Sequence, residues 1–219
     1  MQVKVLQNIL GANEAIAAEN RRLFDRYGTF VVNLMSSPGA GKTSLILRTV
    51  KKLRDRVKMA VIEGDVASRV DADKISQEGI SVIQINTGGG CHLDANMIRR
   101  ALEELPLDDI KLLFIENVGN LICPAEFALG EHRKVMILSL PEGDDKPHKY
   151  PLMFSEADAI VVNKVDLAPH LDFNLSTFRE AVTDLNPEAE ILEVSCRSGE
   201  GIENWVSWLL TEMKSAYRI

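Results

Sequence analysis

The chain has 219 residues, of which 46% are hydrophobic and 26% charged, and its formal net charge at pH 7 is −7. This length suits one α/β domain with a single large core. The acidic balance excludes a surface built to coat nucleic acid, because phosphate backbones are bound by clustered basic groups. Neither an apolar run of about 20 residues nor a secretory leader is present, so we expect a cytoplasmic protein without membrane insertion.

The first segment of the chain predicts a helix. Over Val3–Tyr27, apolar side chains recur near a helical period, with Gly11 as an interruption. We interpret residues 1–28 as a helical extension added to a domain that spans residues 29–219. No internal repeat, low-complexity tract or interdomain linker divides that domain.

From residue 29 onward, short apolar runs alternate with helical patterns. The expected strands are Thr29–Met35, Val57–Ile62, Ile80–Ile85, Lys111–Ile115, Val135–Leu140, Ala159–Val162 and Glu190–Val194. Between them, Asp94 is a candidate N-cap for a helix that Pro106 ends, and the last helix is expected from near Gly201. This alternation predicts an α/β fold with a mostly parallel, doubly wound sheet and helices on both faces.

A phosphate-binding loop lies between the first strand and the helix after it. Glycines in this loop let backbone N–H groups close around phosphate oxygens, while Lys42 reaches the β- and γ-phosphates and the Thr43 hydroxyl can hold Mg²⁺. Ser36 replaces the glycine with which this pattern usually begins. The residues expected to bind the phosphates are Gly39, Ala40, Gly41, Lys42, Thr43 and Ser44. The loop predicts a P-loop NTPase that binds a nucleoside triphosphate.

A second motif predicts which base is bound. Asn163, Lys164 and Asp166 follow an apolar strand, in the position that reads the purine. A carboxylate can accept two hydrogen bonds from guanine, from N1–H and the 2-amino group, whereas adenine N1 would face its lone pairs. Ser195, Cys196 and Arg197, after the next strand, occupy the place where a backbone N–H commonly contacts guanine O6. We therefore expect GTP, and residues 29–219 are interpreted as a P-loop GTPase domain.

Acidic residues end two other strands. Glu116 is followed by Gly119, the layout of a magnesium-binding acid before a mobile glycine that contacts the γ-phosphate. Asp65 reaches the same carboxyl edge of the sheet, where ligands bind in doubly wound folds. The expected magnesium ligands are Thr43, Asp65 and Glu116, and the expected catalytic residues are Lys42, Asp65 and Glu116. The residue that orients the attacking water is left open among Asp65, Asp71 and Asp73.

Two cysteines and a histidine are candidates for a second metal site. If Cys91, His92 and Cys123 follow neighbouring parallel strands, their side chains can converge at one rim of the sheet. Two thiolates and an imidazole suit Ni²⁺ or Zn²⁺, although Zn²⁺ generally needs a fourth ligand, and a two-fold dimer could bring two such sets together. From the residues alone, inert thiols and a nucleophilic Cys91 remain open as well. His132 and His148 are expected at the surface.

Together these motifs resemble the HypB family, the GTPases that assist nickel insertion into [NiFe]-hydrogenase. The stretch Glu116–Pro124 is the most specific part of the resemblance. By this similarity, Cys91, His92 and Cys123 match the metal site of the family's GTPase domain, and the fold belongs to the P-loop GTPases that dimerise face to face over nucleotide. Many members carry an N-terminal cysteine motif or a histidine-rich tract, and residues 1–27 contain neither, which argues against nickel storage.

The resemblance implies a GTP-hydrolysing metallochaperone with GTP, Mg²⁺ and either Ni²⁺ or Zn²⁺. It also implies a homodimer favoured by GTP, and as partners a nickel-delivery co-chaperone and the hydrogenase large subunit. A urease-type nickel GTPase is a competing interpretation, but its Cys-Pro-His string is absent because Ala125 follows Cys123 and Pro124. An ATP-dependent ATPase or kinase of the same fold, and a metal carrier without significant turnover, also compete with the GTPase interpretation.

Overall fold

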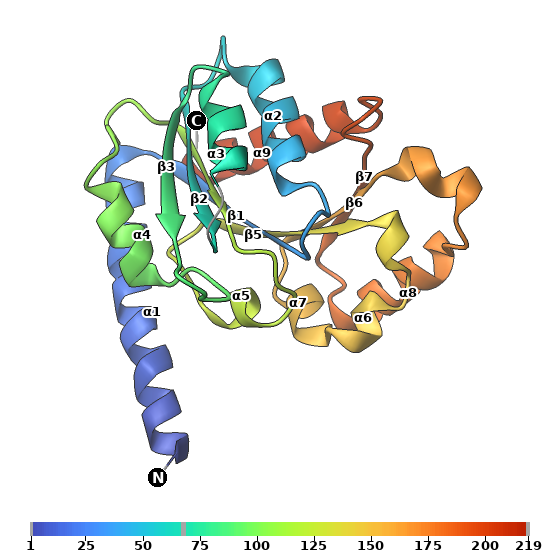
Figure 1. Ribbon diagram of the computed structural model, residues 1–219, viewed down its shortest axis with the longest axis horizontal. Coiled ribbons are helices and arrows are strands. Elements are labelled where there is room, and N and C mark those ends of the chain that lie inside the picture. The colour runs from blue at the N-terminus through green and yellow to red at the C-terminus, as the bar shows by residue number, and fades with distance from the viewer. Residues whose placement is uncertain (1, 67–68, 218–219) are drawn as a thin grey trace.

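A computed structural model describes residues 2–66 and 69–217, with side chains from residue 10 onward (Figure 1). Its described strands form one parallel sheet in the order β3-β2-β4-β1-β5-β6-β7. The strands are β1 (Phe30–Ser36), β2 (Met59–Asp65), β3 (Ser81–Asn86), β4 (Leu112–Glu116), β5 (Arg133–Ser139), β6 (Ala159–Asn163) and β7 (Glu190–Glu193). Each expected strand is therefore confirmed, with its ends shifted slightly.

Helices cover both faces of this sheet, which confirms the doubly wound α/β fold (Figure 1). The helices are α1 (Gln2–Tyr27), α2 (Lys42–Leu53), α3 (Val70–Ser76), α4 (Ala95–Leu102), α5 (Cys123–Glu126), α6 (Lys146–Lys149), α7 (Pro151–Ser155), α8 (Leu175–Leu185) and α9 (Ile202–Tyr217), with 3₁₀ turns η1 (Leu140–Glu142) and η2 (Val165–His170). Helices α2 and α9 pack on one face, α1 and α4 on part of the other, and α7 and α8 on the rest. None of the described helices combines the length and apolarity that crossing a bilayer requires.

Strand periodicity decides which side chains face the P-loop helix α2. In β2, Val61 packs in the core beneath α2, while its neighbour Ile62 points to the opposite face, beneath α1 and α4. Because successive side chains alternate, Glu63 returns to the α2 face. Phe114 in β4 also belongs to the core beneath α2, so Glu116 points to that same face. The alternation thus places two strand acids beside the helix that follows the P-loop.

Helix α1 is continuous through Gly11, so the expected interruption is wrong. A Cβ at Gly11 would meet no atom within 4 Å, and the glycine is tolerated in an open stretch of helix. Further along, Asn13 and Asn20 bond to backbone groups at the start of α4 and in the loop before β5. Phe24 is fully buried in the core under α4. The domain boundary at residue 28 stays a prediction, but α1 packs closely on the sheet domain.

His132 is buried, so its expected surface position is wrong, whereas His148 is exposed as expected. The Val31 N–H donates to His132 Nδ1 at 3.1 Å. On the other side of the ring, Nε2 lies 3.1 Å from both Asp25 Oδ1 at the end of α1 and the Tyr217 hydroxyl at the end of α9. Burial lowers the pKa of His132 to about 4. The neutral ring therefore joins two helices that lie far apart in the sequence.

We predict that His132 makes the fold sensitive to acid. Because its pKa in the folded chain lies below the unfolded value, the unfolded chain binds the proton first as the pH falls. The stability contributed by the neutral ring is complete above about pH 6.5 and is lost progressively toward pH 4, by up to about 3 kcal/mol. Urea unfolding at several pH values should show a shallower loss in His132→Asn than in the wild type. Equal slopes would contradict this, and His148→Asn is the control.

Candidate functional site

The P-loop joins β1 to α2 and closes against the loop that follows β6. Gly41 has a φ of 114°, and a Cβ there would lie 2.2 Å from Asn163 Nδ2. Asn163 Nδ2 also donates to the carbonyl of the buried Ala40 at 2.8 Å. Gly39 is left-handed as well, with a φ of 76°. Gly41 is therefore required both by its conformation and by the close approach of Asn163, and Gly39 is favoured by its conformation alone.

Lys42, Thr43 and Ser44 begin α2, where the first N–H groups of the helix have no helical partner and can bind an anion. The buried Lys42 donates from Nζ to Ser36 Oγ at 3.1 Å. Burial lowers the pKa of Lys42, and the nearby Glu116 carboxylate opposes that effect. Thr43 donates from its hydroxyl to Glu116 Oε1 at 2.8 Å. The structure thus brings the expected phosphate-binding and magnesium-binding side chains together.

A second buried acid, which sequence reasoning missed, lies next to Glu116. Glu63 and Glu116 are register partners on β2 and β4, exposed by only 3% and 4%. Burial raises the pKa of Glu63 to about 8, and the neighbouring Glu116 and Asp65 add to the rise. Burial also raises the pKa of Glu116 to about 7, although Lys42 and Thr43 oppose it. The sequence signal was an acid inside the apolar strand β2.

The oxygens gathered at these strand ends fit a hydrated Mg²⁺ ion. In the described part of the chain, Oε2 of Glu63 and Oε2 of Glu116 are the buried side-chain oxygens without a hydrogen-bond partner. Asp65, at the end of β2, points to the same face, and the Thr43 hydroxyl completes a set of oxygen donors. Carboxylate and hydroxyl oxygens at a phosphate site are what Mg²⁺ requires.

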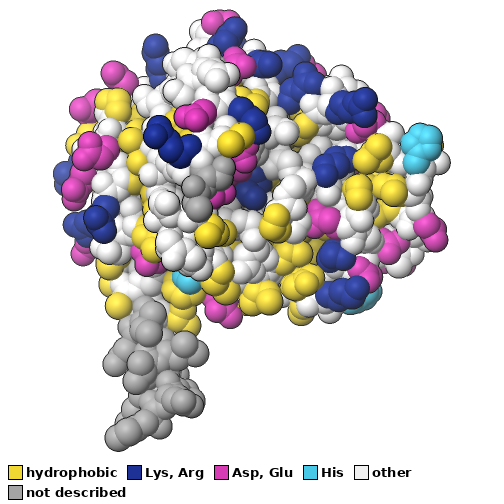
Figure 2. Space-filling model, viewed as in Figure 1, with side chains coloured by type: hydrophobic (Ala, Val, Ile, Leu, Met, Phe, Trp, Pro, Cys, Tyr) yellow, Lys and Arg dark blue, Asp and Glu magenta, His cyan; other side chains and the backbone are white. Residues whose placement is uncertain are grey.

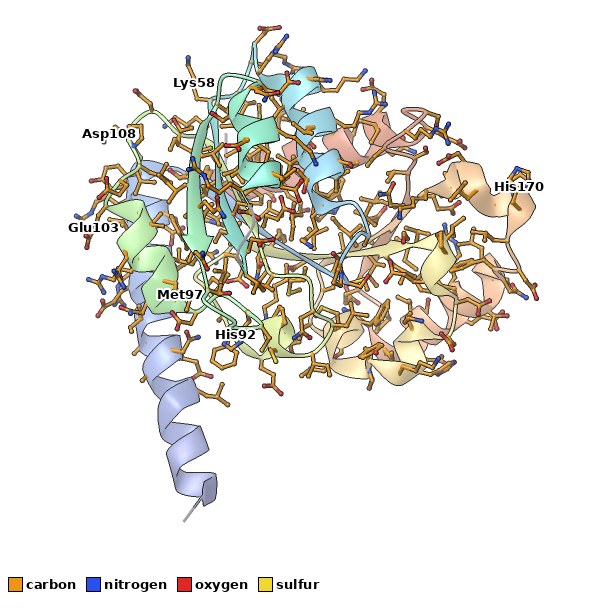
Figure 3. The ribbon with its side chains drawn as sticks, viewed as in Figure 1. Lys58, His92, Met97, Glu103, Asp108 and His170 are labelled. Atoms are coloured by element: carbon orange, nitrogen blue, oxygen red, sulfur yellow. The ribbon has the colours of Figure 1, made fainter. Side chains whose placement is uncertain are left out.

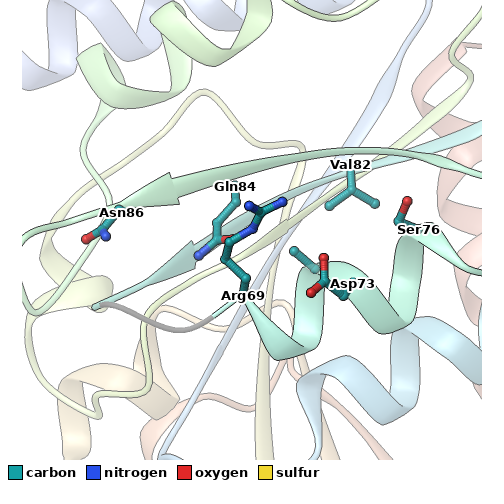
Figure 4. A pocket seen from close by; sticks show the side chains of 7 residues that line it. Arg69, Asp73, Ser76, Val82, Gln84 and Asn86 are labelled. Atoms are coloured by element: carbon teal, nitrogen blue, oxygen red, sulfur yellow. The ribbon is translucent and has the colours of Figure 1, made fainter.

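The structure separates the two remaining acids that could orient water. Asp73 lines a pocket of about 490 Å³ between α3 and the edge strand β3, together with Arg69 and Gln84 (Figure 4). No P-loop residue lines that pocket. Asp71, in the first turn of α3, acts electrostatically on Lys42, although its carboxylate also pairs with Lys74 at 2.7 Å. Asp71 is therefore the candidate on the P-loop side, and Asp73 lies outside the site.

The loop after β6 contacts the P-loop through a strained residue. Lys164 has a φ of 63°, the one positive φ among the described non-glycine residues, and its Nζ donates to the Gly39 carbonyl at 2.8 Å. Such conformations persist where the surroundings enforce them, often at functional sites. Asp166 accepts a hydrogen bond from the buried Ser195 hydroxyl at 2.5 Å. The carboxylate expected to read the base is thus oriented by the loop after β7.

The loop after β7 contains a backbone contact that differs from the one expected from the sequence. Cys196 N–H donates to Asn163 Oδ1 at 3.1 Å, so the predicted contact with guanine O6 would compete with this bond. Arg48 of α2, which sequence reasoning also missed, donates to the carbonyls of Cys196 and Arg197, both at 2.6 Å. An arginine on a helix surface carries no sequence signal for such a role. Arg48 fixes the loop after β7 to the P-loop helix.

Cys91, His92 and Cys123 come together at the rim of the sheet. Cys91 Sγ lies 3.0 Å from Cys123 Sγ and 3.5 Å from His92 Nδ1, and the three ligand atoms all lie within 4.8 Å of one another. The cysteines follow β3 and β4, which are separated by β2, so convergence does not need the neighbouring strands we expected. Cys91 is exposed, which does not match a thiol buried as core filling.

The histidine of this cluster is held by an aromatic contact beside α5 (Figure 3). The His92 ring stacks on Phe127 with ring centroids 4.0 Å apart. Burial lowers the pKa of His92, and the contact with Cys91 raises the pKa of Cys123. A neutral imidazole offers a lone pair to a metal, and a bound cation would favour the thiolates. The cluster can therefore hold a borderline or soft metal ion.

The segment between Glu116 and Cys123 is bonded along the P-loop. Asn120 N–H donates to the Ser36 carbonyl at 2.8 Å, and Asn120 Oδ1 accepts from Ile122 N–H at 2.8 Å. A Cβ at Gly119 would lie 2.9 Å from the backbone N and Cα of Pro38. These contacts connect the start of the P-loop with the residue that precedes Cys123.

The loop that carries Cys91 and His92 is joined to the same segment by Asn117. This fully buried residue donates from its backbone to the Leu34 carbonyl at 3.0 Å, and its Oδ1 accepts from Leu93 N–H at 3.1 Å. Leu93 directly follows His92. Sequence reasoning missed Asn117 and Asn120 as connecting residues, because their bonds depend on which strands are adjacent. The loop that carries Cys91 and His92 is therefore hydrogen-bonded to the segment that follows β4, and Cys123 ends that segment.

Comparison with known proteins gives matches over nearly the whole chain. The family described as "CobW/HypB/UreG, nucleotide-binding domain" matches residues 30–193. Hydrogenase maturation factor HypB of Rhizobium leguminosarum bv. viciae is 52% identical, over 99% of this chain and 72% of that protein. The crystal structure of HypB from Helicobacter pylori in complex with nickel has a TM-score of 0.89 at 40% identity, covering 94% of this chain and 97% of that one. For Hydrogenase Maturation Factor HypB from Archaeoglobus fulgidus, the TM-score is 0.87 at 40% identity, with coverage of 93% and 99%.

We predict that Gly119→Ala weakens nucleotide binding. The new methyl group would lie too close to the backbone of Pro38, so either the P-loop or the segment after β4 must move, at about 1–3 kcal/mol. The affinity for a nonhydrolysable GTP analogue should fall correspondingly, as measured by calorimetric titration. Gly11→Ala is the matched control, since its Cβ meets open space. Unchanged affinity in Gly119→Ala would show that the contact is irrelevant.

Proposed function

Because the chain belongs to the HypB family, within the CobW/HypB/UreG group of P-loop GTPases, we propose that it hydrolyses GTP in order to deliver nickel to a [NiFe]-hydrogenase. The observation that carries the proposal is the segment after β4, which contacts the P-loop at one end and presents Cys123 at the other. A movement of this segment with the nucleotide state would move a metal ligand. The proposal of nickel delivery is supported by relatives named as hydrogenase maturation factors, and by one such relative whose crystal structure is a complex with nickel.

Each residue at the nucleotide site would have a separate role in binding or hydrolysis. Lys42 would neutralise the β- and γ-phosphates, and the Asp166 carboxylate would select guanine. Thr43, Asp65 and Glu116 would hold Mg²⁺, which stabilises the negative charge that spreads over the phosphates during transfer. The N-terminus of α2 adds backbone donors at the same place.

Nickel would be bound as cargo by Cys91, His92 and Cys123. Three protein ligands leave coordination positions open, and an exposed thiol lets the ion be passed on. Exposed apolar side chains lie nearby, with Ile122 57% exposed beside Cys123 and Leu152 44% exposed on α7. Figure 2 shows hydrophobic side chains along this lower edge of the molecule. This edge suits the proposed partners, which are a second copy of the chain in a GTP-favoured dimer, a nickel-delivery co-chaperone and the hydrogenase large subunit.

We predict that Asp166→Asn changes the base preference. The asparagine keeps the shape but turns an N–H donor toward the 2-amino group of guanine, which is also a donor, so the affinity for GTP should fall about ten- to a hundredfold. Xanthosine triphosphate, which carries a carbonyl in place of the 2-amino group, should gain affinity. Competition among GTP, ATP and xanthosine triphosphate against a fluorescent analogue measures this. A variant that still prefers GTP would contradict the role of Asp166, and wild-type preference for ATP would favour an ATPase or kinase.

We predict that the nickel affinity of the wild type changes between the nucleotide-free protein and the complex with a nonhydrolysable GTP analogue. Coupling of this kind is typically 5- to 150-fold and is reciprocal. Asn120→Ala removes the acceptor for the Ile122 N–H and a side-chain hydrogen bond to Cys123, so it should reduce the difference while keeping all three ligand residues. Nickel titrations with and without the analogue measure both effects.

The controls for this experiment separate ligand loss from loss of coupling. Cys91→Ala should abolish tight nickel binding in either nucleotide state, whereas Cys196→Ala, which removes a thiol outside the cluster, should not. Equal nickel affinity in both states of the wild type would refute coupling. GTP turnover no faster than that of Lys42→Ala would instead identify a metal carrier without significant turnover.

A further inference from the structure

Two acids are deeply buried beside the P-loop among the described residues, Glu63 and Glu116. The proposed function gives a role to Glu116 but none to Glu63. It lies in β2, in register with Glu116 of β4, and its side chain is on the face beside α2. Neighbouring strands lie about 4.8 Å apart, so the two carboxyl groups leave the sheet side by side. Lys42 is the cation whose charge acts on both. This arrangement is a carboxylate pair at the bottom of the nucleotide site.

The pair is not satisfied by the protein itself. Glu63 and Glu116 are each more than nine-tenths buried, and in the described residues Oε2 of each lacks a hydrogen-bond partner. A buried unpaired oxygen of this kind opposes folding unless something binds it. One carboxylate oxygen of Glu116 already accepts a hydrogen bond from Thr43, which is an expected Mg²⁺ ligand. The Glu63 oxygen at the same height of the sheet points to the same occupant.

We propose that Glu63 is a further residue of the Mg²⁺ site, where it accepts hydrogen bonds from the water molecules that stay on the ion. This inference rests on the proposed function. Glu63 precedes the strand end at Asp65 by two residues, or about 6.6 Å along β2, so it lies deeper in the sheet than Asp65. Because Mg²⁺ gives up its water reluctantly, a deep carboxylate serves it through retained water.

The role is one of positioning and affinity rather than chemistry. Glu63 would bring a further negative charge to the cation and fix the far side of its water shell. Glu116 and Thr43 would then face the ion from the side of the P-loop. Nucleotide binding would consequently depend more strongly on the Mg²⁺ concentration than it would with Glu116 as the one buried acid.

The test is the concentration of Mg²⁺ that gives half-maximal binding of a fluorescent nonhydrolysable GTP analogue. In Glu63→Gln this midpoint should rise about tenfold, the effect of one charge interaction near 1.4 kcal/mol. Affinity for the analogue at saturating Mg²⁺ should stay within about twofold of the wild type. Electron paramagnetic resonance of Mn²⁺, bound in place of Mg²⁺ with the same analogue, gives a direct second readout that does not depend on turnover.

Two further variants keep the test decisive. Glu103→Gln removes the same charge from an exposed position and should leave the Mg²⁺ midpoint unchanged. Glu63→Asp keeps the charge but withdraws it by one methylene, so its midpoint should lie between those of wild type and Glu63→Gln. An unchanged midpoint in Glu63→Gln, or lost analogue binding even at saturating Mg²⁺, would overturn the inference. If wild-type protein itself binds no guanine nucleotide with Mg²⁺, the proposed function fails instead.

Discussion

The pairing of β4 with β1 continues beyond the last strand residue, and the site depends on this continuation. Asn117 N–H donates to the Leu34 carbonyl and Asn120 N–H to the Ser36 carbonyl, so the chain after Glu116 runs along the start of the P-loop. Gly119 is the residue that allows this, because any side chain there would meet Pro38. The P-loop and the segment leading to Cys123 therefore cannot move independently without breaking backbone hydrogen bonds.

This constraint would let the proposed nucleotide and metal sites act on each other at short range. A ligand shifts the equilibrium between two arrangements of a protein only by the difference between its affinities for them. Here the proposed nucleotide site and the proposed metal site both contact the same short segment after β4. The hydrogen bond of Asn117 Oδ1 to Leu93 N–H extends the connection to the loop that carries Cys91 and His92. The proposed coupling needs no long pathway, since the groups involved are bonded to neighbouring residues of one strand end.

The sequence predicted the parts of the structure that follow from local pattern. Apolar runs located the strands, and the N-cap at Asp94 is confirmed by its bond to Met97 N–H. What it could not predict depends on which elements become neighbours. Glu63 belongs to a carboxylate pair only because β4 places Glu116 beside it, and His132 is buried only because two helix ends close over it. The convergence of Cys91, His92 and Cys123 was predicted from residue types, but the position of β2 between the two strands that precede them was not.

The departures from ordinary folding rules occur at one edge of the sheet. The central strands β1, β4 and β6 are buried along their length and mostly apolar, whereas unpartnered carboxylate oxygens and a left-handed lysine occur at or near the carboxyl ends of the strands. Each of these features opposes folding by itself and is retained where surrounding contacts enforce it. Replacing a buried acid by an uncharged residue at such a place commonly stabilises a chain while removing its function. The carboxylate pair of Glu63 and Glu116 therefore indicates that a cation, rather than the fold, is the partner these side chains are built to meet.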